Sequence, residues 1–186
     1  MDDRPAVTLI CLADGHPADV LYAVWATHRP RFDMAVLSCV GDAEDAGDRD
    51  RFHRTVAEAG PRYAVFVHGT AARHLPTYAM PGLQPPPLHV FLAASPVDTW
   101  GPLDAVTVPL TVFAAASTPA DRQAAMADGL TWRDRWGGEF DMRLFDAGPD
   151  FLTACATEVL FLIGQELSVV GGAIPAVQGF ASGGCP

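Results

Sequence analysis

Three side chains of this sequence could move protons if the fold brings them together. Asp14 and His16 follow the first apolar run of the chain, and His68 ends a later apolar run that begins at Tyr63. An open α/β sheet binds ligands at the carboxyl ends of its strands, where these three residues would meet. We expect Asp14, His16 and His68 to form a catalytic acid–base group. In the alternative, structural interpretation, Asp14 and His16 cap a helix near Pro17 and His68 donates a hydrogen bond to the backbone.

The turn after His68 has the sequence of a nucleophile elbow without its nucleophile. Hydrolases with the pattern G-x-S-x-G hold a serine on a sharp turn from strand to helix. Here the turn falls on residues 67–71, VHGTA, and Gly69 stands where the serine would be. The elbow needs a backbone of positive φ, which glycine adopts at little steric cost. We expect Gly69 and Thr70 to contact the substrate.

Two other groups could act as nucleophiles. Thr70 would do so if the register of the elbow slipped by one residue, and Cys39 is a thiol at the end of the second predicted strand. The apolar residues of the preceding strand favour Gly69 at the elbow, and buried packing is the simpler role for Cys39. Both alternatives stay open at the level of the sequence.

Neither a metal nor a cofactor is expected. The histidines lack the i, i+4 spacing of a helical metal site, and the four cysteines lack any C-x-x-C spacing. Cys11, Cys39 and Cys155 lie in apolar runs, where cysteine usually behaves as a small buried hydrophobe, so we expect no disulfide framework. The chain contains no lysine, which excludes Schiff-base chemistry.

The composition limits the classes of molecule that the protein is expected to bind. A length of 186 residues with 49% hydrophobic residues is enough for one sizeable core. A formal net charge of -10 argues against nucleic acid and anionic membranes as partners, because both would repel the protein. The acidic N-terminal residues lack the apolar region of a secretory signal, and no apolar run approaches the ~20 residues that span a bilayer. We expect a cytoplasmic protein that binds small molecules or proteins.

Short apolar runs alternate with longer helical patterns, which is typical of strand–helix–strand units around a mostly parallel sheet. Most of the runs are continuous, as expected for strands that helices cover on both faces. The predicted strands are Val7 to Ala13, Met34 to Val40, Tyr63 to His68, Leu88 to Ala94, Pro109 to Ala115 and Phe140 to Phe145. The predicted helices are Ala18 to His28, Asp48 to Ala59, Thr70 to Met80, Pro119 to Arg135 and Asp150 to Leu167. One domain is expected over residues 1–168, followed by a Gly- and Ala-rich tail over residues 169–186.

In order and spacing, several segments resemble the type II thioesterases, the α/β hydrolases that serve polyketide synthases and nonribosomal peptide synthetases. Residues 66–71, FVHGTA, fall where that family has F-G-H-S-M-G. Residues 145–152, FDAGPDFL, are similar to its F-x-G-G-H-F-F-L. The segments 9–12, 88–92 and 109–113 match the family's strands in the same order. The resemblance implies an α/β hydrolase fold with about six strands and helices on both faces of the sheet.

The resemblance also implies that the catalytic triad of the family is missing. Its serine maps to Gly69 and its histidine to Pro149. Its acid falls near Ser117 or Thr118. Glycine and proline can neither attack a carbonyl nor transfer a proton, and loss of one triad member already lowers the rate by orders of magnitude. Asp150, one residue past the lost histidine, could reach the substrate, although its simplest role is to cap the last helix.

Two further departures from the family concern the surroundings of the elbow. The segment between Pro96 and Val108 is too short for the family's helical lid, so we expect the lid to be deleted. Asp14 replaces part of the oxyanion loop, where its charge would repel a tetrahedral intermediate. Both departures favour a degenerate member of the family that no longer hydrolyses thioesters.

Two classes of function follow from the resemblance. In the first, the chain cyclises, isomerises or epimerises a small or carrier-bound intermediate of a polyketide or peptide pathway in the former thioesterase pocket. In the second, it is a noncatalytic accessory that binds a synthase subunit or an acyl or peptidyl carrier protein. Such carriers are acidic, so docking would need one of the arginine clusters at residues 49–62 and 133–135, which are equally typical of an ordinary mixed-charge surface. Loss of the lid could also open a surface for a homodimer.

Overall fold

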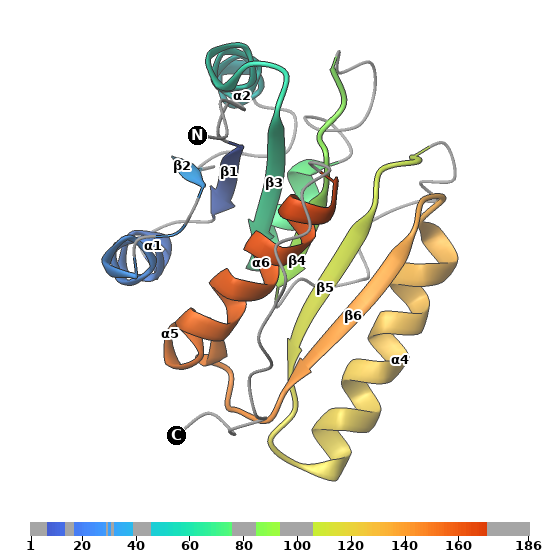
Figure 1. Cartoon of the computed structure of the whole chain (residues 1–186). Coiled ribbons are helices and arrows are strands. Elements are labelled where there is room, and N and C mark those ends of the chain that lie inside the picture. The colour runs from blue at the N-terminus through green and yellow to red at the C-terminus, as the bar shows by residue number, and fades with distance from the viewer. Residues whose placement is uncertain are drawn as a thin grey trace.

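A parallel sheet forms the centre of the molecule (Figure 1). The structure, a computed structural model, describes residues 7–13, 17–28, 30, 32–38, 46–75, 85–93 and 106–170. The six strands lie in the order β2-β1-β3-β4-β5-β6, and every neighbouring pair is parallel. The strands are β1 (Thr8–Ala13), β2 (Asp33–Ser38), β3 (Tyr63–His68), β4 (Val90–Ala93), β5 (Leu110–Ala115) and β6 (Phe140–Phe145). Their carboxyl ends therefore share one side of the sheet, as the sequence predicted.

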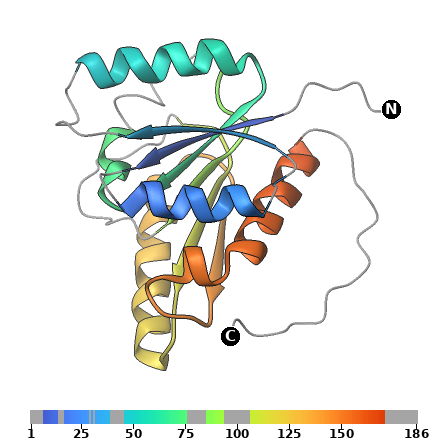
Figure 2. The ribbon, with the colours of Figure 1, turned by 90° about the vertical axis from the view of Figure 1, so that its left-hand side faces the viewer.

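Helices cover both faces of this sheet (Figures 1 and 2). The α-helices are α1 (Pro17–Thr27), α2 (Ala46–Ala59), α4 (Pro119–Arg135), α5 (Phe151–Ala154) and α6 (Ala156–Val170). A 3-10 helix, η1 (Gly69–His74), follows β3. Side chains of α1, α5 and α6 pack on one face of the sheet, and side chains of α2, η1 and α4 pack on the other. The predicted α/β architecture, a parallel sheet of six strands with helices on both faces, is confirmed.

Each face of the sheet has its own hydrophobic core. Because side chains alternate along a strand, neighbouring residues of one strand feed different cores. Leu9 and Cys11 pack toward α1 and α6, whereas Ile10 and Leu12 pack toward α2 and η1. The fully buried aromatic side chains of the two cores are Trp25, Phe66, Phe91, Phe113 and Phe151 on the first face, and Phe52, Tyr63 and Trp132 on the second. Burial on both faces explains the continuous apolar runs of the central strands.

The last predicted helix is broken in two, which is a correction to the expected single helix from Asp150 to Leu167. The indole Nε1 of Trp25 donates a 2.8 Å hydrogen bond to the carbonyl oxygen of Leu152. That carbonyl lies in the short helix α5, and its bond to a side chain 127 residues away replaces the continuation of the helix. The second part, α6, runs to Val170 and so includes the first two residues of the predicted tail over residues 169–186, whose remainder lies outside the described residues.

Two cysteines belong to the described part of the chain. Cys11 is buried and free, as expected, and burial raises the pKa of its thiol. Cys155 is buried too, but it is disulfide-bonded, contrary to our expectation. Its partner lies outside the described residues. A bond between cysteines far apart in the sequence leaves no local spacing pattern, so the sequence could not reveal it.

Candidate functional site

The turn between β3 and η1 has the backbone of an elbow. His68 ends β3 in an extended conformation, with φ -119° and ψ 135°, and Gly69 turns the chain with a φ of 63°. This left-handed region is accessible to glycine at little cost and is unfavourable for most other residues. The 3-10 helix then carries Ala71 and Ala72 into the core, where their small side chains let it lie close to the sheet. The predicted positive φ at Gly69 is confirmed, whereas the predicted α-helix is a 3-10 helix as far as it is described.

The space beside Gly69 is open. A Cβ atom built on this residue would meet no atom of the described residues within 4 Å. Two glycines elsewhere differ, because a Cβ on Gly129 would lie 2.3 Å from Sδ of Met142 and one on Gly138 would lie 2.3 Å from the carbonyl oxygen of Val108. Close packing therefore does not explain the glycine at the elbow. Position 69 has room for a side chain and carries none.

His68 is the ionisable side chain next to this open position. Its ring is half-buried, and burial lowers its pKa below the ordinary value of 6.5. The ring is therefore neutral at neutral pH, the form that can accept a proton. The alternation of β3 places His68 on the face that α1 covers, and its ring makes no capping hydrogen bond to η1. The expected hydrogen bond from His68 to the backbone is absent from the described part of the chain.

The other two predicted contact residues, Thr70 and Asp150, are both exposed. Thr70, the second residue of η1, is exposed, and its hydroxyl has no hydrogen-bond partner in the described structure. Asp150 lies at the start of α5 and is exposed, but its side chain does not cap the helix. The backbone carbonyl of Asp150 accepts the hydrogen bond from Oγ1 of Thr153 instead. The expected capping role of the Asp150 carboxylate was therefore wrong, whereas its contact with a substrate stays a prediction.

Asp14 and His16 lie outside the described residues, and so does Cys39. The same holds for residues 94–105, where the deleted lid was expected. The proposed meeting of Asp14, His16 and His68 therefore stays a prediction. What the described residues establish is one neutral histidine beside a glycine elbow with free space around it.

The carboxyl end of β5 holds a helix cap where the resemblance puts the catalytic acid. Oγ1 of Thr118 accepts a 3.1 Å hydrogen bond from the backbone N–H of Asp121, and Oδ2 of Asp121 accepts a 3.0 Å bond from the N–H of Thr118. The hydroxyl of Ser117 donates to the same carboxylate oxygen at 3.0 Å. These bonds from Thr118 and Ser117 lower the pKa of Asp121. Ser117, Thr118 and Asp121 thus start α4 as a capping box.

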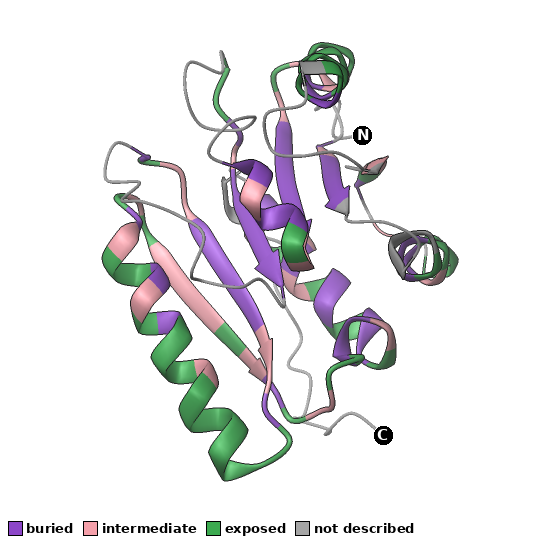
Figure 3. Cartoon of the chain, turned by 180° about the vertical axis from the view of Figure 1, so that it is seen from behind, coloured by how far each residue is buried: buried purple, intermediate pink, exposed green. Residues whose placement is uncertain are grey.

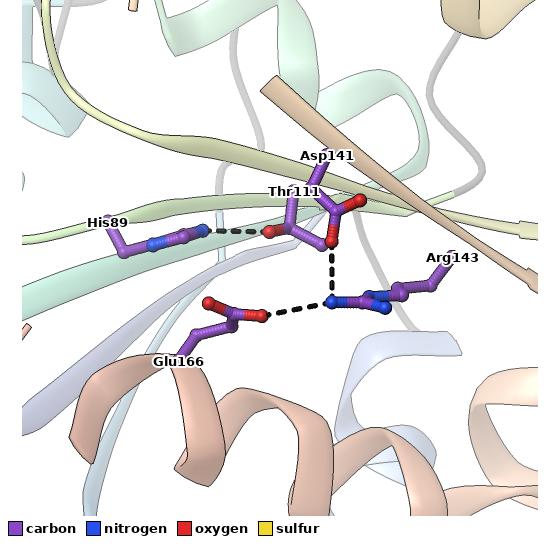
Figure 4. Close-up of polar contacts among 5 residues, drawn as sticks. All are labelled: His89, Thr111, Asp141, Arg143 and Glu166. Carbon is purple, nitrogen blue, oxygen red and sulfur yellow. Dashed lines mark hydrogen bonds and ion pairs between the residues drawn. The ribbon is translucent and has the colours of Figure 1, made fainter. Parts of the chain in front are cut away.

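A buried polar group at the opposite end of the sheet escaped the sequence analysis. His89 precedes β4, is 4% exposed and shares a 2.9 Å hydrogen bond between its Nε2 and Oγ1 of Thr111 (Figure 4). Its ring stacks on Phe91 at 4.3 Å between centroids. Burial lowers its pKa to about 4, and the charge of Asp141 opposes this shift. The neutral ring is therefore part of the core and far from the elbow along the sheet.

A groove of about 600 Å³ lies between α4 and the edge strand β6. Its walls include Met126 and Leu130 of α4 and Phe140, Met142 and Leu144 of β6. Two strands separate β6 from β3, so this groove is not the concavity expected beside Gly69. The concavity expected beside Gly69 stays a prediction.

Among the solved structures with a similar fold are two thioesterases and a sugar hydrolase. The RedJ thioesterase from the prodiginine biosynthetic pathway in Streptomyces coelicolor is 15% identical, with a TM-score of 0.58 over 86% of this chain and 85% of that chain. The type II thioesterase BorB from the borrelidin biosynthetic cluster is 15% identical, with a TM-score of 0.58 over 87% of this chain and 93% of that chain. The chain has the α/β hydrolase fold of these thioesterases.

A sugar hydrolase, YeeB from Lactococcus lactis, is also similar, at 12% identity and a TM-score of 0.55 over 89% of this chain and 88% of that chain. No protein-family model and no curated protein matches the sequence. Within the residues that the structure describes, no three His, Cys, Asp or Glu side chains gather as a metal site. No described helix is both long and apolar enough to cross a membrane. The α/β hydrolase fold thus places the elbow, but the chemistry must come from the side chains around it.

Proposed function

We propose that this thioesterase-like protein acts on an intermediate of a polyketide or nonribosomal peptide pathway without hydrolysing it. The observation that carries the proposal is Gly69, which holds the elbow backbone at a φ of 63° with open space around it and no hydroxyl. A covalent acyl-enzyme cannot form at this position. Binding at the carboxyl ends of the strands would still hold a substrate beside His68.

A neutral histidine is suited to accept a proton from an acidic carbon atom of the substrate. A carbon between a carbonyl and a thioester or second carbonyl is acidic enough for His68 to accept its proton, which leaves an enolate beside an imidazolium. Return of the proton to the other face inverts the carbon. Attack of the enolate carbon on a ketone carbonyl of the same molecule closes a ring instead, and the alkoxide that forms takes the proton from the imidazolium. Epimerisation, isomerisation and cyclisation thus share one first step, in which the proton moves to His68.

Asp14, His16, Thr70 and Asp150 complete the proposed site. A carboxylate at Asp14 would stabilise a protonated histidine, and His16 could return the proton. Thr70 and Asp150 are exposed polar side chains that could orient the substrate by hydrogen bonds. The substrate could arrive as a free small molecule or as the thioester of an acyl or peptidyl carrier protein.

Deuterium exchange at the acidic carbon of simple thioesters tests this proposal. A panel of linear β-ketoacyl thioesters of N-acetylcysteamine is incubated with the protein in D₂O, and mass spectrometry follows deuterium uptake while a thiol assay follows hydrolysis. We expect exchange or ring closure with no thiol release above buffer. His68→Gln should lower the exchange by about 100-fold, the typical share of a general base, whereas the same change at the exposed His53 of α2 should retain it.

Two results would contradict the proposed function and favour another one. Thiol release that disappears in Thr70→Val would make Thr70 a working nucleophile and the protein a hydrolase. Tight binding of a carrier protein with no exchange, ring closure or hydrolysis of any thioester in the panel would support the noncatalytic accessory role.

A further inference from the structure

The outer side of the edge strand β6 has backbone N–H and C=O groups that could bind another strand. β6 is the last strand of the sheet, and no described residue pairs with its outer side. The carbonyl of Glu139 accepts from the N–H of Leu110, and the carbonyl of Phe145 accepts from the N–H of Ala116. Odd-numbered residues here therefore turn their backbone groups toward β5. In a parallel ladder the residues between them turn theirs outward, so Phe140, Met142 and Leu144 present free N–H and C=O groups.

The side chains of β6 divide between its two faces. Phe140, Met142 and Leu144 line the groove beside α4, where Met126 is 47% and Leu130 is 53% exposed. The view from behind shows β6 at intermediate exposure and the outer side of α4 exposed, in contrast to the buried central strands (Figure 3). An apolar strip thus follows the free edge on the α4 side, which is an unfavourable surface to leave in water.

The other face of β6 carries two opposite charges. Asp141 and Arg143 both point toward α6, where an Arg143 nitrogen lies 2.7 Å from a carboxylate oxygen of Asp141 and 3.3 Å from one of Glu166 (Figure 4). The two charges stand two residues apart on the same face of the strand. If both had the same sign, they would repel an added strand, which is how many edges avoid pairing.

An antiparallel copy of β6 complements this pattern. In the register centred on Met142, Phe140 lies opposite Leu144 of the second copy, and the outward N–H and C=O groups of these residues meet as hydrogen-bonded pairs. Asp141 then lies opposite Arg143 of the second copy, in a pair without backbone bonds, whose Cα atoms come within about 4.5 Å. By symmetry the same pair forms again on the other side of the axis.

We propose that two copies of this chain form a homodimer through antiparallel pairing of their β6 strands, with Asp141 and Arg143 fixing the register. The two sheets then continue into one, and the α4 helices lie side by side on one face. Met126 and Leu130 of each copy cover those of the other. This interface leaves the elbow at Gly69 free, because β4 and β5 separate it from β6.

Complementary charge variants test the pairing. Sedimentation equilibrium of the full chain should give twice the mass of the 19.7 kDa monomer. Asp141→Arg and Arg143→Asp each place like charges opposite each other in both symmetric pairs, so each should weaken the dimer at least about tenfold. The two variants mixed together should dimerise again, because every charge then faces its opposite. Each variant lacks the internal ion pair, so only pairing between chains can explain this recovery.

Controls separate the interface from folding and from the tail. Circular dichroism should show each variant folded, and Arg51→Asp, which reverses the charge of an exposed arginine paired with Asp48 on α2, should leave the dimer unchanged. Leu130→Glu should weaken the dimer without unfolding the chain, since Leu130 is exposed.

A monomeric wild-type chain at its highest soluble concentration would overturn the proposal. So would a dimer that both single charge variants retain. A chain that dimerises only after removal of residues 171–186 would identify the tail as the occupant of the edge and would overturn it equally.

Discussion

The two ends of the sheet differ in how side chains fill the space beyond the strands. At the amino end, Nε1 of Trp136 donates to the carbonyl oxygen of Val108 at 2.7 Å, and the Tyr63 hydroxyl donates to that of Pro85 at 2.9 Å. At the carboxyl end, Gly69 faces open space and Thr70 is exposed. At the amino end, side chains are fixed by hydrogen bonds to the backbone. At the carboxyl end, polar groups lie beside unoccupied space. A site for a ligand is expected at the second end.

The largest effect is expected at the amino end of the sheet, where the stability of the fold should depend on pH. The pKa of His89 falls from 6.5 to about 4 on folding. Between these values the unfolded chain binds a proton that the folded chain does not, so stability falls as pH falls through this window. The free energy of unfolding should drop by about 3 kcal/mol between pH 7 and pH 4 from this residue.

Urea unfolding at several pH values measures the effect. His89→Gln should remove this part of the slope, while the same change at the exposed His53 should leave it. If the free energy of unfolding varied with pH in the same way in the wild type and in His89→Gln, the burial of His89 at the amino end of the sheet would be contradicted.

The next effect comes from close packing at the same end. A Cβ on Gly138 would lie 2.3 Å from the backbone carbonyl oxygen of Val108, which cannot move aside as a flexible side chain can. Gly138→Ala should lower the free energy of unfolding by about 2 kcal/mol, the usual cost of overpacking. A loss below about 0.5 kcal/mol in thermal or urea unfolding would show that the turn before β6 is looser than the structure has it.

Two threonines give a matched pair across the sheet. Thr111 is buried and hydrogen-bonded to His89, so Thr111→Val should cost about 1.5 kcal/mol by leaving the ring nitrogen without a partner. Thr70 is exposed, and Thr70→Val should change the free energy of unfolding by less than about 0.5 kcal/mol. If chemical unfolding gave equal losses in the free energy of unfolding for the two variants, the distinction between the two ends of the sheet would be contradicted.

The smallest effect concerns the elbow itself. In Gly69→Ala the new methyl group meets no atom of the described residues within 4 Å, and the φ of 63° is what opposes it. The cost should be about 1 kcal/mol, the strain of a left-handed backbone. Gly60 has a φ of 75° and equally free surroundings, so Gly60→Ala is a matched control that should cost about the same. A much larger loss at Gly69 would mean that the space beside the elbow is filled.

The sequence predicted what local patterns determine. The apolar run from Tyr63 to His68 forms β3 with the predicted bounds, because a strand buried on both faces must be apolar throughout. The positive φ of Gly69 followed from the turn that the elbow needs. Features set by contacts between distant segments escaped prediction. The break after α5 depends on Trp25, and the low pKa of His89 depends on burial beneath other strands.

The site was predicted less completely than the fold. His68 lies at the elbow as expected, but nothing in its own sequence neighbourhood showed that it would be half-buried and lack a capping bond. The cap formed by Ser117, Thr118 and Asp121 could have been found from the spacing of Thr118 and Asp121 before a helical run with Pro119 at its start. Asp14 and His16 remain to be placed by experiment.

The vacant space beside Gly69 also bears on how this protein can evolve. In the genetic code a single base change converts some glycine codons to serine, and the fold would tolerate the new hydroxyl at the modest strain given above. The resemblance puts the histidine of the family at Pro149, so under the proposed function a gain of hydrolysis would need a base there as well. A serine at position 69 alone would therefore leave the proposed protein without hydrolysis.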